Sequence, residues 1–231
     1  MQLSLQLELP APGIAPGRFV MVQIGEHLEP FLRRPFFIAG AADDTVALLV
    51  ARRGRAGSWL AARHPGDAVS LLGPLGKGIA AASGVRNLLL AANGVDVAPL
   101  LLLAERTAAQ RSITVLLGST ESEVGYPAAL LPPEVEALSI AGGPDGQALA
   151  DAVAEHAAWA DQVVVAGSEA LLARVASLLR SRLLRRTVTA MLITPLPCGT
   201  GVCNGCAVQT RRRGLRLACL DGPAFELRDL Y

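Results

Sequence analysis

Four cysteines near the end of the chain form the most distinctive chemical pattern in the sequence. They are the only cysteines among 231 residues: Cys198, Cys203, Cys206 and Cys219. The first three follow a C-x4-C-x2-C spacing, and the fourth comes after twelve intervening residues. This spacing is typical of plant-type loops that bind a [2Fe–2S] cluster through thiolates. We therefore predict that all four cysteines are metal ligands and that the protein carries electrons.

The residues between the cysteines favour the same interpretation. Gly199, Gly201 and Gly205 can form tight turns with positive φ and direct backbone N–H groups at the sulfurs. A structural zinc site built from the same four thiolates is the alternative. Zinc sites usually pair two short cysteine knuckles, whereas here one loop supplies three ligands, so the spacing favours iron–sulfur.

Composition and charge limit the class of protein. Hydrophobic residues make up 52% of the chain and the net charge is +1, so bulk charge indicates neither a nucleic-acid nor a membrane partner. The basic run Arg211–Arg213 is short, and we interpret it as a solvated turn. The most apolar stretch, Leu88–Ala104, is too short to span a membrane and contains Asp96. The chain begins without a signal-peptide pattern, and we expect a cytoplasmic location, where disulfides are disfavoured.

The chain divides into three parts by its pattern of strands and turns. Residues 1–82 predict a small antiparallel β-barrel, because short apolar runs alternate with turns that contain Pro and Gly. Residues 83–194 predict a Rossmann-like α/β nucleotide-binding domain, because apolar strands alternate with helical stretches. Residues 195–231 predict a loop-rich segment that holds the cluster.

The expected strands of the barrel are Gln2–Leu9, Arg18–Ile24, Pro35–Ala39, Thr45–Val50 and Ala68–Leu72. Those of the α/β domain are Leu88–Ala92, Ile113–Gly118, Ala137–Ile140, Val163–Ala166 and Val188–Ile193. Its clearest helices are Val97–Ala109, Gln147–His156 and Glu169–Leu184.

Several motifs along most of the chain resemble the ferredoxin–NADP reductase superfamily, and within it the electron-transfer subunits of class 1B dihydroorotate dehydrogenases. Pro16–Val22 resembles an early strand of the family, and Arg33–Ile38 falls at its flavin motif Arg-Pro-x-Ser. Gly73–Gly78 is similar to its Gly-Pro-Leu-Gly-Asn-Gly turn. The most specific similarity is the ending, from Cys198 through Asp221-Gly222-Pro223 to Phe225.

The resemblance implies an electron relay with a partner. In the family, a catalytic subunit oxidises dihydroorotate on FMN during pyrimidine biosynthesis, and electrons then pass through [2Fe–2S] and FAD to NAD+. The resemblance therefore implies a heterotetramer in which this chain performs no substrate chemistry of its own. A related reductase subunit of another redox complex is one alternative. A non-redox assembly subunit with degenerate flavin and nucleotide sites is another.

The partner is expected to dock near the cluster. Apolar residues flank the cysteines, and they are compatible with a buried interface or, equally, with a shell around the cluster. They are Leu196, Val202, Leu215 and Leu217.

The resemblance also implies FAD, with contacts from three short segments. These are Arg34, Pro35, Phe36 and Phe37; Leu49, Val50 and Ala51; and Ala56, Gly57 and Ser58. The planar guanidinium of Arg34 can bind the FAD diphosphate through two hydrogen bonds. Phe37 stands where the family has Ser or Thr, so it cannot donate a hydrogen bond to the flavin ring, although it can stack or fill the pocket.

The expected nucleotide loop departs further from the family. Its Gly-Gly-Gly-x-Gly-x-x-Pro motif, whose glycines let the backbone approach a diphosphate, is replaced by Ala92–Pro99. Asp96 adds bulk and negative charge at this place, and it also suits an N-cap for a helix that begins near Val97. The later Ala166–Glu169 resembles the family's Cys-Gly-Pro-Glu without its Cys and Pro. We therefore expect NAD binding to be weakened or lost.

Overall fold

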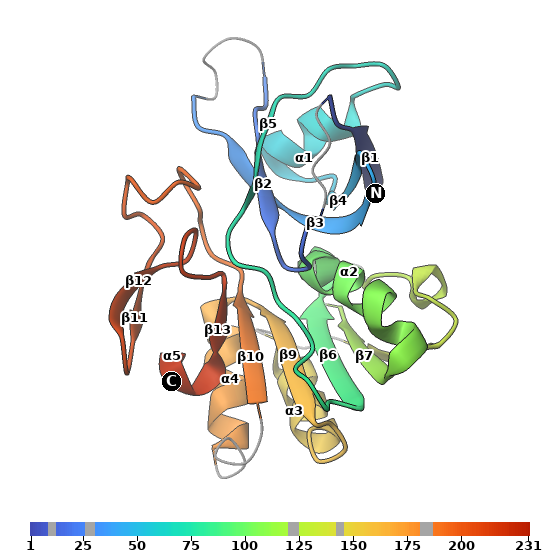
Figure 1. Ribbon diagram of the computed structural model, residues 1–231, viewed down its shortest axis with the longest axis vertical. Coiled ribbons are helices and arrows are strands. Elements are labelled where there is room, and N and C mark those ends of the chain that lie inside the picture. Colours follow the sequence, from blue (N-terminus) through green and yellow to red (C-terminus); the bar gives the residue numbers. More distant parts are fainter. Residues whose placement is uncertain (9–12, 26–30, 120–124, 142–145, 181–186) are drawn as a thin grey trace.

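The computed structural model describes residues 1–8, 13–25, 31–119, 125–141, 146–180 and 187–231. It has a β-rich unit above an α/β unit, and the cysteine segment lies beside both (Figure 1). Among the described residues, no helix combines the length and the apolar character needed to cross a membrane.

The β-rich unit is a five-stranded antiparallel sheet with the order β1-β4-β3-β2-β5. Alternation of apolar and polar residues in the first strand turns Leu3 and Leu5 toward a core that contains Val46 and Leu48. A short helix, α1, connects the fourth and fifth strands. The bounds are β1 Gln2–Gln6, β2 Phe19–Val22, β3 Arg34–Ala42, β4 Thr45–Leu49, α1 Gly54–Ala61 and β5 Leu71–Leu75.

The α/β unit is a six-stranded sheet with the order β13-β10-β9-β6-β7-β8. Five of its strands are parallel, and β13 from the cysteine segment adds an antiparallel edge. Its strands are β6 Asn87–Asn93, β7 Ser112–Gly118, β8 Val135–Ile140, β9 Gln162–Gly167 and β10 Thr187–Leu192. Its helices are η1 Gly94–Val97, α2 Ala98–Thr107, η2 Ala108–Gln110, η3 Ala128–Leu130, α3 Gln147–His156 and α4 Glu169–Leu179.

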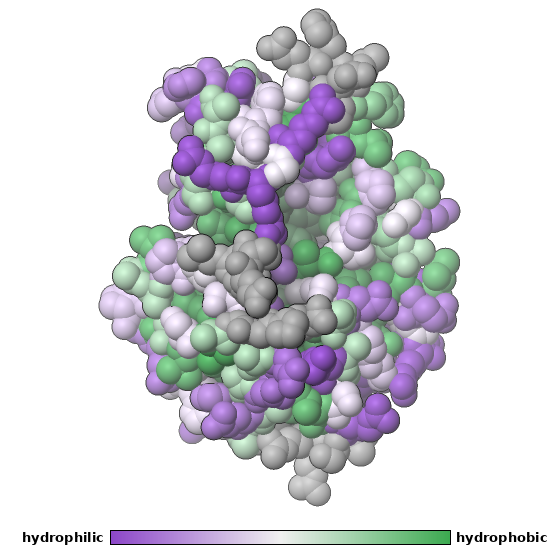
Figure 2. Space-filling view, turned by 180° about the vertical axis from the view of Figure 1, so that it is seen from behind, coloured by the Kyte–Doolittle hydropathy of each residue, from purple (hydrophilic) through white to green (hydrophobic). Residues whose placement is uncertain are grey.

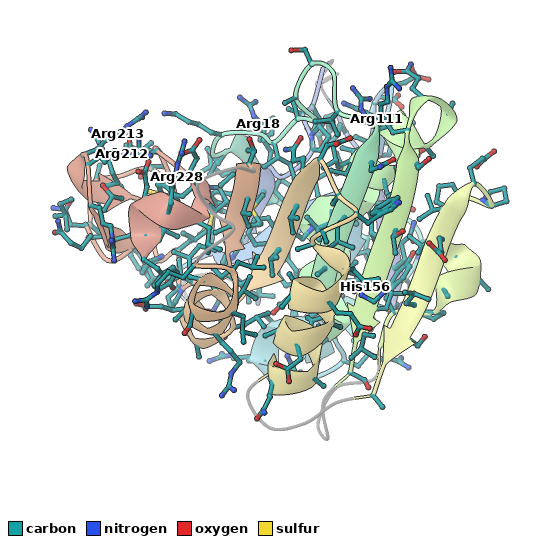
Figure 3. All side chains as sticks on the ribbon, turned by 90° about the horizontal axis from the view of Figure 1, so that it is seen from below. Arg18, Arg111, His156, Arg212, Arg213 and Arg228 are labelled. Atoms are coloured by element: carbon teal, nitrogen blue, oxygen red, sulfur yellow. The ribbon has the colours of Figure 1, made fainter. Side chains whose placement is uncertain are left out.

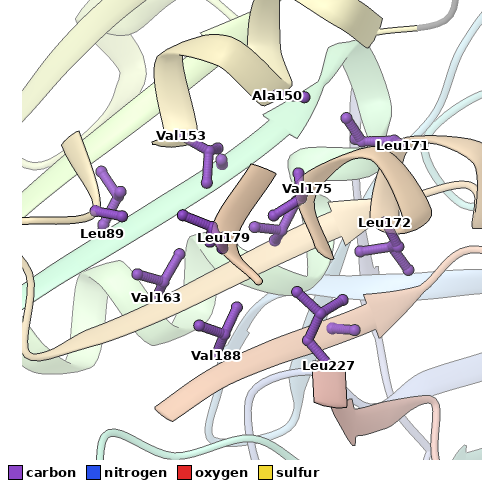
Figure 4. Packing of buried hydrophobic residues seen from close by; sticks show 14 of the residues in the cluster. Leu89, Ala150, Val153, Val163, Leu171, Leu172, Val175, Leu179, Val188 and Leu227 are labelled. Carbon is purple, nitrogen blue, oxygen red and sulfur yellow. The ribbon is translucent and has the colours of Figure 1, made fainter. Parts of the chain in front are cut away.

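Both faces of this sheet are covered, which explains its continuous apolar strands. On one face, Leu89, Val163 and Val188 of the strands pack against side chains of α3 and α4, as Figure 4 shows. On the other face, α2 packs against the sheet and also inserts Leu102 into the core of the β-rich unit. Because Leu102 is fully buried there, the two units share one helix as a packing element.

The cysteine segment contains a two-stranded hairpin, the edge strand and a short terminal helix. They are β11 Ala207–Thr210, β12 Gly214–Leu217, β13 Ala224–Glu226 and α5 Leu227–Leu230. The basic run forms the hairpin turn, where Arg212 and Arg213 lie near Arg228 (Figure 3). Arg212 pairs with Asp229 at 2.6 Å, which links the hairpin to the terminal helix, and Arg228 of that helix pairs with Glu226 at 2.6 Å.

The predicted fold class is confirmed: an antiparallel β unit, a Rossmann-like α/β unit and a cysteine-bearing ending. The helix Gln147–His156 has the expected bounds, and α4 begins at Glu169 with Ser168 as its N-cap; the expected part beyond 180 lies outside the described residues. The expected strand Ala68–Leu72 is misplaced, since β5 runs from Leu71 to Leu75 and pairs with β2. Helix α1 and strands β11 to β13 were not predicted.

Candidate functional site

The four cysteines lie on two turns that face each other in the C-terminal segment. Cys198 and Cys203 precede the hairpin β11–β12, Cys206 lies at its start, and Cys219 follows its second strand. Cys206 and Cys219 are buried, Cys198 is half-buried and Cys203 is exposed. The structure therefore brings all four predicted ligands into one region that extends from the interior to the surface.

The sulfur atoms are arranged as two pairs. The Sγ atoms of Cys206 and Cys219 lie 3.3 Å apart. Cys203 is hydrogen-bonded to the sulfur of Cys198 through both its backbone and its side chain. Among the described residues, which include all four cysteines, no group of three or more His, Cys, Asp or Glu side chains is arranged to hold a metal ion. Two pairs suit a cluster in which each iron takes two thiolates better than a single tetrahedral zinc ion.

Backbone N–H groups point at the sulfurs, as the sequence predicted. Thr200 donates to Cys198 Sγ and Gly205 donates to Cys203 Sγ, each at 3.4 Å. Gly199 and Gly201 have φ values of 72° and 84°, which confirms the predicted turns. The prediction of a positive φ for Gly205 was wrong, because Asn204 takes that conformation instead, with φ 54°.

The pKa values of two thiols depend on these surroundings. Burial opposes ionisation of Cys198, but hydrogen bonds from Cys203 and Thr200 outweigh it and lower its pKa to about 6. Burial, together with the Cys206 side chain, raises the pKa of Cys219 to about 12. A coordinating metal deprotonates a thiol outright, so both environments are compatible with metal-bound thiolates.

The cysteine loop packs directly against the β-rich unit. A Cβ atom on Gly199 would lie 2.7 Å from Met21 Cγ and 3.0 Å from Leu75 Cδ1. The backbone N–H of Lys77 donates to the carbonyl of Gly222 at 2.6 Å. Glycine at 199 therefore allows the loop to approach strands β2 and β5 closely.

Phe37 lies where the three parts of the molecule meet. Its side chain packs against the apolar cluster that contains Cys206 and Cys219, and also against the core of the α/β unit. Its ring is 6.1 Å from that of Phe19 in an edge-to-face arrangement. A serine would not fill this position, so the phenylalanine replaces a polar contact with packing.

The residues expected to contact FAD lie on neighbouring elements. Arg34 to Phe37 occupy β3, Leu49 ends the adjacent strand β4, and Ala56 to Ser58 lie in α1. Val50 and Phe36 face the core of the β-rich unit, and Val50 is fully buried, with its backbone N–H and carbonyl both bonded to Met1, so Val50 itself does not reach a ligand. Arg34 Nη1 donates to the carbonyl of Leu32 at 2.8 Å.

Helix α1 offers an anion-binding end beside these residues. No side chain caps its N-terminus, and no acidic residue lies in its first turn. Arg52, Arg53 and Arg55 are exposed around this end. Backbone N–H donors together with arginines are the groups that bind a diphosphate, so the chain's residues fit this part of FAD.

The expected nucleotide loop is a 3₁₀ turn rather than a glycine-rich loop. The prediction that Asp96 caps the following helix was wrong: Asp96 lies inside η1, and α2 has no side-chain cap hydrogen bond. Burial raises the pKa of Asp96 to about 6, and the positive charge of Arg53 opposes that rise. The loop therefore carries a half-buried carboxylate at a position where the motif it resembles has a glycine.

Three residues that contribute to these sites were not predicted from the sequence. Arg53 belongs to the run Arg52-Arg53-Gly54-Arg55, and this concentration of positive charge could have indicated an anion-binding site at the N-terminus of α1. Met21, which packs against Gly199, and Asn93, whose side chain lies against Gly118 and Gly146, carried no such signal, because only the fold places those glycines beside them.

The C-terminal segment matches a known family. Residues 195–231 match the family model described as the iron-sulfur cluster binding domain of dihydroorotate dehydrogenase B. Over nearly its whole length, the chain is similar to proteins named dihydroorotate dehydrogenase B (NAD(+)), electron transfer subunit. The Desulforamulus reducens protein is 29% identical over 237 residues, which cover 95% of this chain and 89% of the relative. That of Geobacillus thermodenitrificans is 29% identical over 235 residues, covering 97% and 90%.

Solved structures share the fold. A chain from the NADH-dependent reduced ferredoxin-NADP oxidoreductase superposes with a TM-score of 0.82 at 21% identity, covering 100% of this chain and 84% of that one. A ferredoxin reductase of carbazole 1,9a-dioxygenase gives a TM-score of 0.61 at 18% identity, covering 80% and 60%. The fold is thus that of the ferredoxin reductases.

Proposed function

We propose that this chain, which resembles the electron transfer subunits of dihydroorotate dehydrogenase B along almost all its length, is an electron-transfer subunit. It relays electrons between a partner dihydroorotate dehydrogenase-type flavoprotein and an acceptor, with [2Fe–2S] and FAD as cofactors. The observation that carries this proposal is the pairing of four cysteines within the segment that matches the iron-sulfur family.

The cysteine region fits a [2Fe–2S] cluster by its donor chemistry. Cys198 and Cys203 would hold one iron, and Cys206 and Cys219 the other. The cluster supplies single-electron transfer, and the flavin exchanges electrons singly or in pairs. The N–H groups of Thr200 and Gly205 stabilise negative charge on the sulfurs and so favour the reduced state.

The chain's own side chains keep water away from the region between the cysteines and the β-rich unit. Phe19 and Met21 are fully buried between these parts, and Phe37 closes the side toward the α/β unit. A dry, closely packed junction keeps the expected cofactors at a fixed separation. The N-terminus of α1, with its arginines, would bind the FAD diphosphate at the outer end.

The surface around the exposed cysteine supports docking of a partner there. Val202, Leu215 and Leu220 have exposed fractions of 80%, 62% and 50%, respectively. Leu196 is buried and Leu217 half-buried, so they belong to the shell around the cysteines. Val202 adjoins Cys203 in the chain, Leu220 approaches Gly201 of the cysteine loop, and Leu215 lies further along the hairpin on β12. Exposed apolar side chains on this segment suit a partner surface that approaches the cluster closely.

We propose a cytoplasmic location and a role in pyrimidine biosynthesis. Four cysteines that serve as cluster ligands would need a compartment in which thiols are not oxidised to disulfides. The names of the relatives support the pathway, since each is a subunit of a dihydroorotate dehydrogenase.

Anaerobic co-purification with a catalytic dihydroorotate dehydrogenase subunit tests the proposal. The complex should contain iron, sulfide and FAD, and dihydroorotate should reduce the cluster only when both subunits are present. A chain that lacks acid-labile sulfide, or a cluster that dihydroorotate leaves oxidised in the complex, would refute it.

A further inference from the structure

The carboxyl ends of β6, β7 and β9 form the edge at which α/β sheets bind dinucleotides. From β6 the chain adds β7 and β8 on one side of the sheet and then crosses to add β9 and β10 on the other side of β6. The direction in which strands are added therefore reverses at β6. Ligands bind outside such a switch point, where the backbone must leave room for phosphates. The molecular surface is hollowed near the level at which the β-rich and α/β units meet (Figure 2).

Asn93 occupies the room that glycines leave at this edge. It pairs with Gly118 across β6 and β7. A Cβ atom on Gly118 would lie 1.9 Å from Asn93 Oδ1, and one on Gly146 would lie 3.1 Å from Asn93 Nδ2. The side-chain amide of Asn93 therefore fills the space between the end of β7 and the start of α3.

Asp96 adds a negative charge to the same edge. It lies half-buried in the turn between β6 and α2, and the positive charge of Arg53, which precedes α1 in the β-rich unit, favours its ionised form. An ionised carboxylate at this turn would repel a phosphate. Two unit charges about 4 Å apart near a protein surface interact strongly enough to change affinity by about 1000-fold.

We propose that Asn93 and Asp96 close this edge to dinucleotides, so that the chain does not bind a pyridine nucleotide as its electron acceptor. The side chain of Asn93 fills the space that a diphosphate would need, and the carboxylate of Asp96 would repel its negative charge. These two residues would decide whether a pyridine nucleotide can accept electrons from this chain, whereas the names of its relatives include NAD(+). The inference rests on the proposed function, because it concerns the acceptor of that relay.

Direct binding of NADH and NADPH to the anaerobically purified, FAD-loaded full chain tests the proposal. Calorimetry should find no saturable binding up to about 1 mM for the wild type. The double variant Asn93→Gly/Asp96→Gly, which restores the glycine pattern, should bind at least tenfold more tightly. Asp96→Asn, which removes only the charge, provides a second measurement if the double variant does not fold, and it should also bind at least tenfold more tightly.

Glu134→Gln is the matched control for loss of a negative charge. Glu134 is exposed and precedes β8, at the opposite edge of the sheet, and this variant should bind no better than wild type. Micromolar binding to the wild type, or no gain in any folded variant at positions 93 and 96, would overturn the inference. Iron, sulfide and FAD are measured on the same samples: their absence refutes the proposed function, whereas tight NADH binding to a fully loaded chain refutes only this inference.

Discussion

Gly57 provides the sharpest test of how α1 is held against the segment proposed to bind the flavin. A Cβ atom on Gly57 would lie 1.9 Å from the backbone carbonyl oxygen of Ala51 and 3.1 Å from its carbon. Carbon and oxygen atoms normally approach to about 3.3 Å, so Gly57→Ala must separate the helix from Ala51 by more than about 1 Å. Because the obstacle is backbone rather than a flexible side chain, rotamer changes cannot relieve it.

The free energy of unfolding should fall despite the better helix propensity of alanine. Glycine to alanine inside a helix ordinarily stabilises a protein by about 1 kcal/mol. Overpacking of this kind costs about 1–3 kcal/mol or more. Because the obstacle is backbone, we place the cost at the top of that range, about 3 kcal/mol, and expect a net loss of about 2 kcal/mol, or a Tm lower by about 4–8 °C for a chain of this size. The displaced helix should also weaken FAD binding at least tenfold, because Ala56 and Ser58 move with it.

FAD content after purification, the FAD Kd by fluorescence and Tm by circular dichroism measure these effects. Gly66→Ala is the control: its φ is 95° and no atom lies within 4 Å of the added Cβ, so it strains the backbone without a collision. It should lower Tm but leave the FAD Kd unchanged. If Gly57→Ala keeps the wild-type FAD Kd, or if Gly66→Ala weakens FAD binding as much as Gly57→Ala does, the reasoning is refuted.

Three further predictions concern other parts of the molecule. The pKa of Asp96 is raised from 3.8 to about 6, so the folded state favours the protonated form of this group. Ionisation of Asp96 therefore lowers the free energy of unfolding as pH rises through that range, by about 3 kcal/mol at pH 8. In urea unfolding, the stability of Asp96→Asn relative to wild type should increase from pH 5 to pH 8, and a difference that stays constant with pH would contradict this. Gly199→Ala should lower iron content, because its Cβ would lie 2.7 Å from Cγ of the fully buried Met21. Gly214→Ala, which has a similar φ of 67° and no atom within 4 Å, should retain iron, and equal losses in the two variants would refute the collision. Leu102→Ala should lower the free energy of unfolding by about 2–5 kcal/mol, because Leu102 is fully buried. It should lower the unfolding midpoints of both units together, because Leu102 belongs to α2 of the α/β unit but packs in the core of the β-rich unit. Separate midpoints for the two units would show that α2 does not couple them.

Local sequence patterns predicted the elements whose causes are local. The apolar runs of β6, β7 and β9 and the bounds of α3 follow from periodicity alone, and the cysteine spacing identified a region that the fold does bring together. Strand β5 was misplaced because its register is set by pairing with β2 and not by its own alternation.

Features that depend on tertiary contacts could not be predicted. Helix α1 depends on the close approach of Gly57 to Ala51, which a glycine in the sequence does not indicate by itself. Asp96 has the residue type of a helix cap, yet the chain forms a 3₁₀ turn before α2, so its carboxylate lies half-buried instead. The role of Asn93 follows from Gly118 and Gly146, which only the folded sheet and helix place beside it.

Iron and acid-labile sulfide in the anaerobically purified chain test the central claim most directly. We predict about two iron and two sulfide per wild-type chain, with an electron paramagnetic resonance signal on reduction. Cys203→Ser should lose most of the iron, whereas Val202→Ser, at an adjacent exposed position, should retain it. A chain with one zinc and no sulfide, or a Cys203→Ser variant with wild-type iron and signal, would contradict the account.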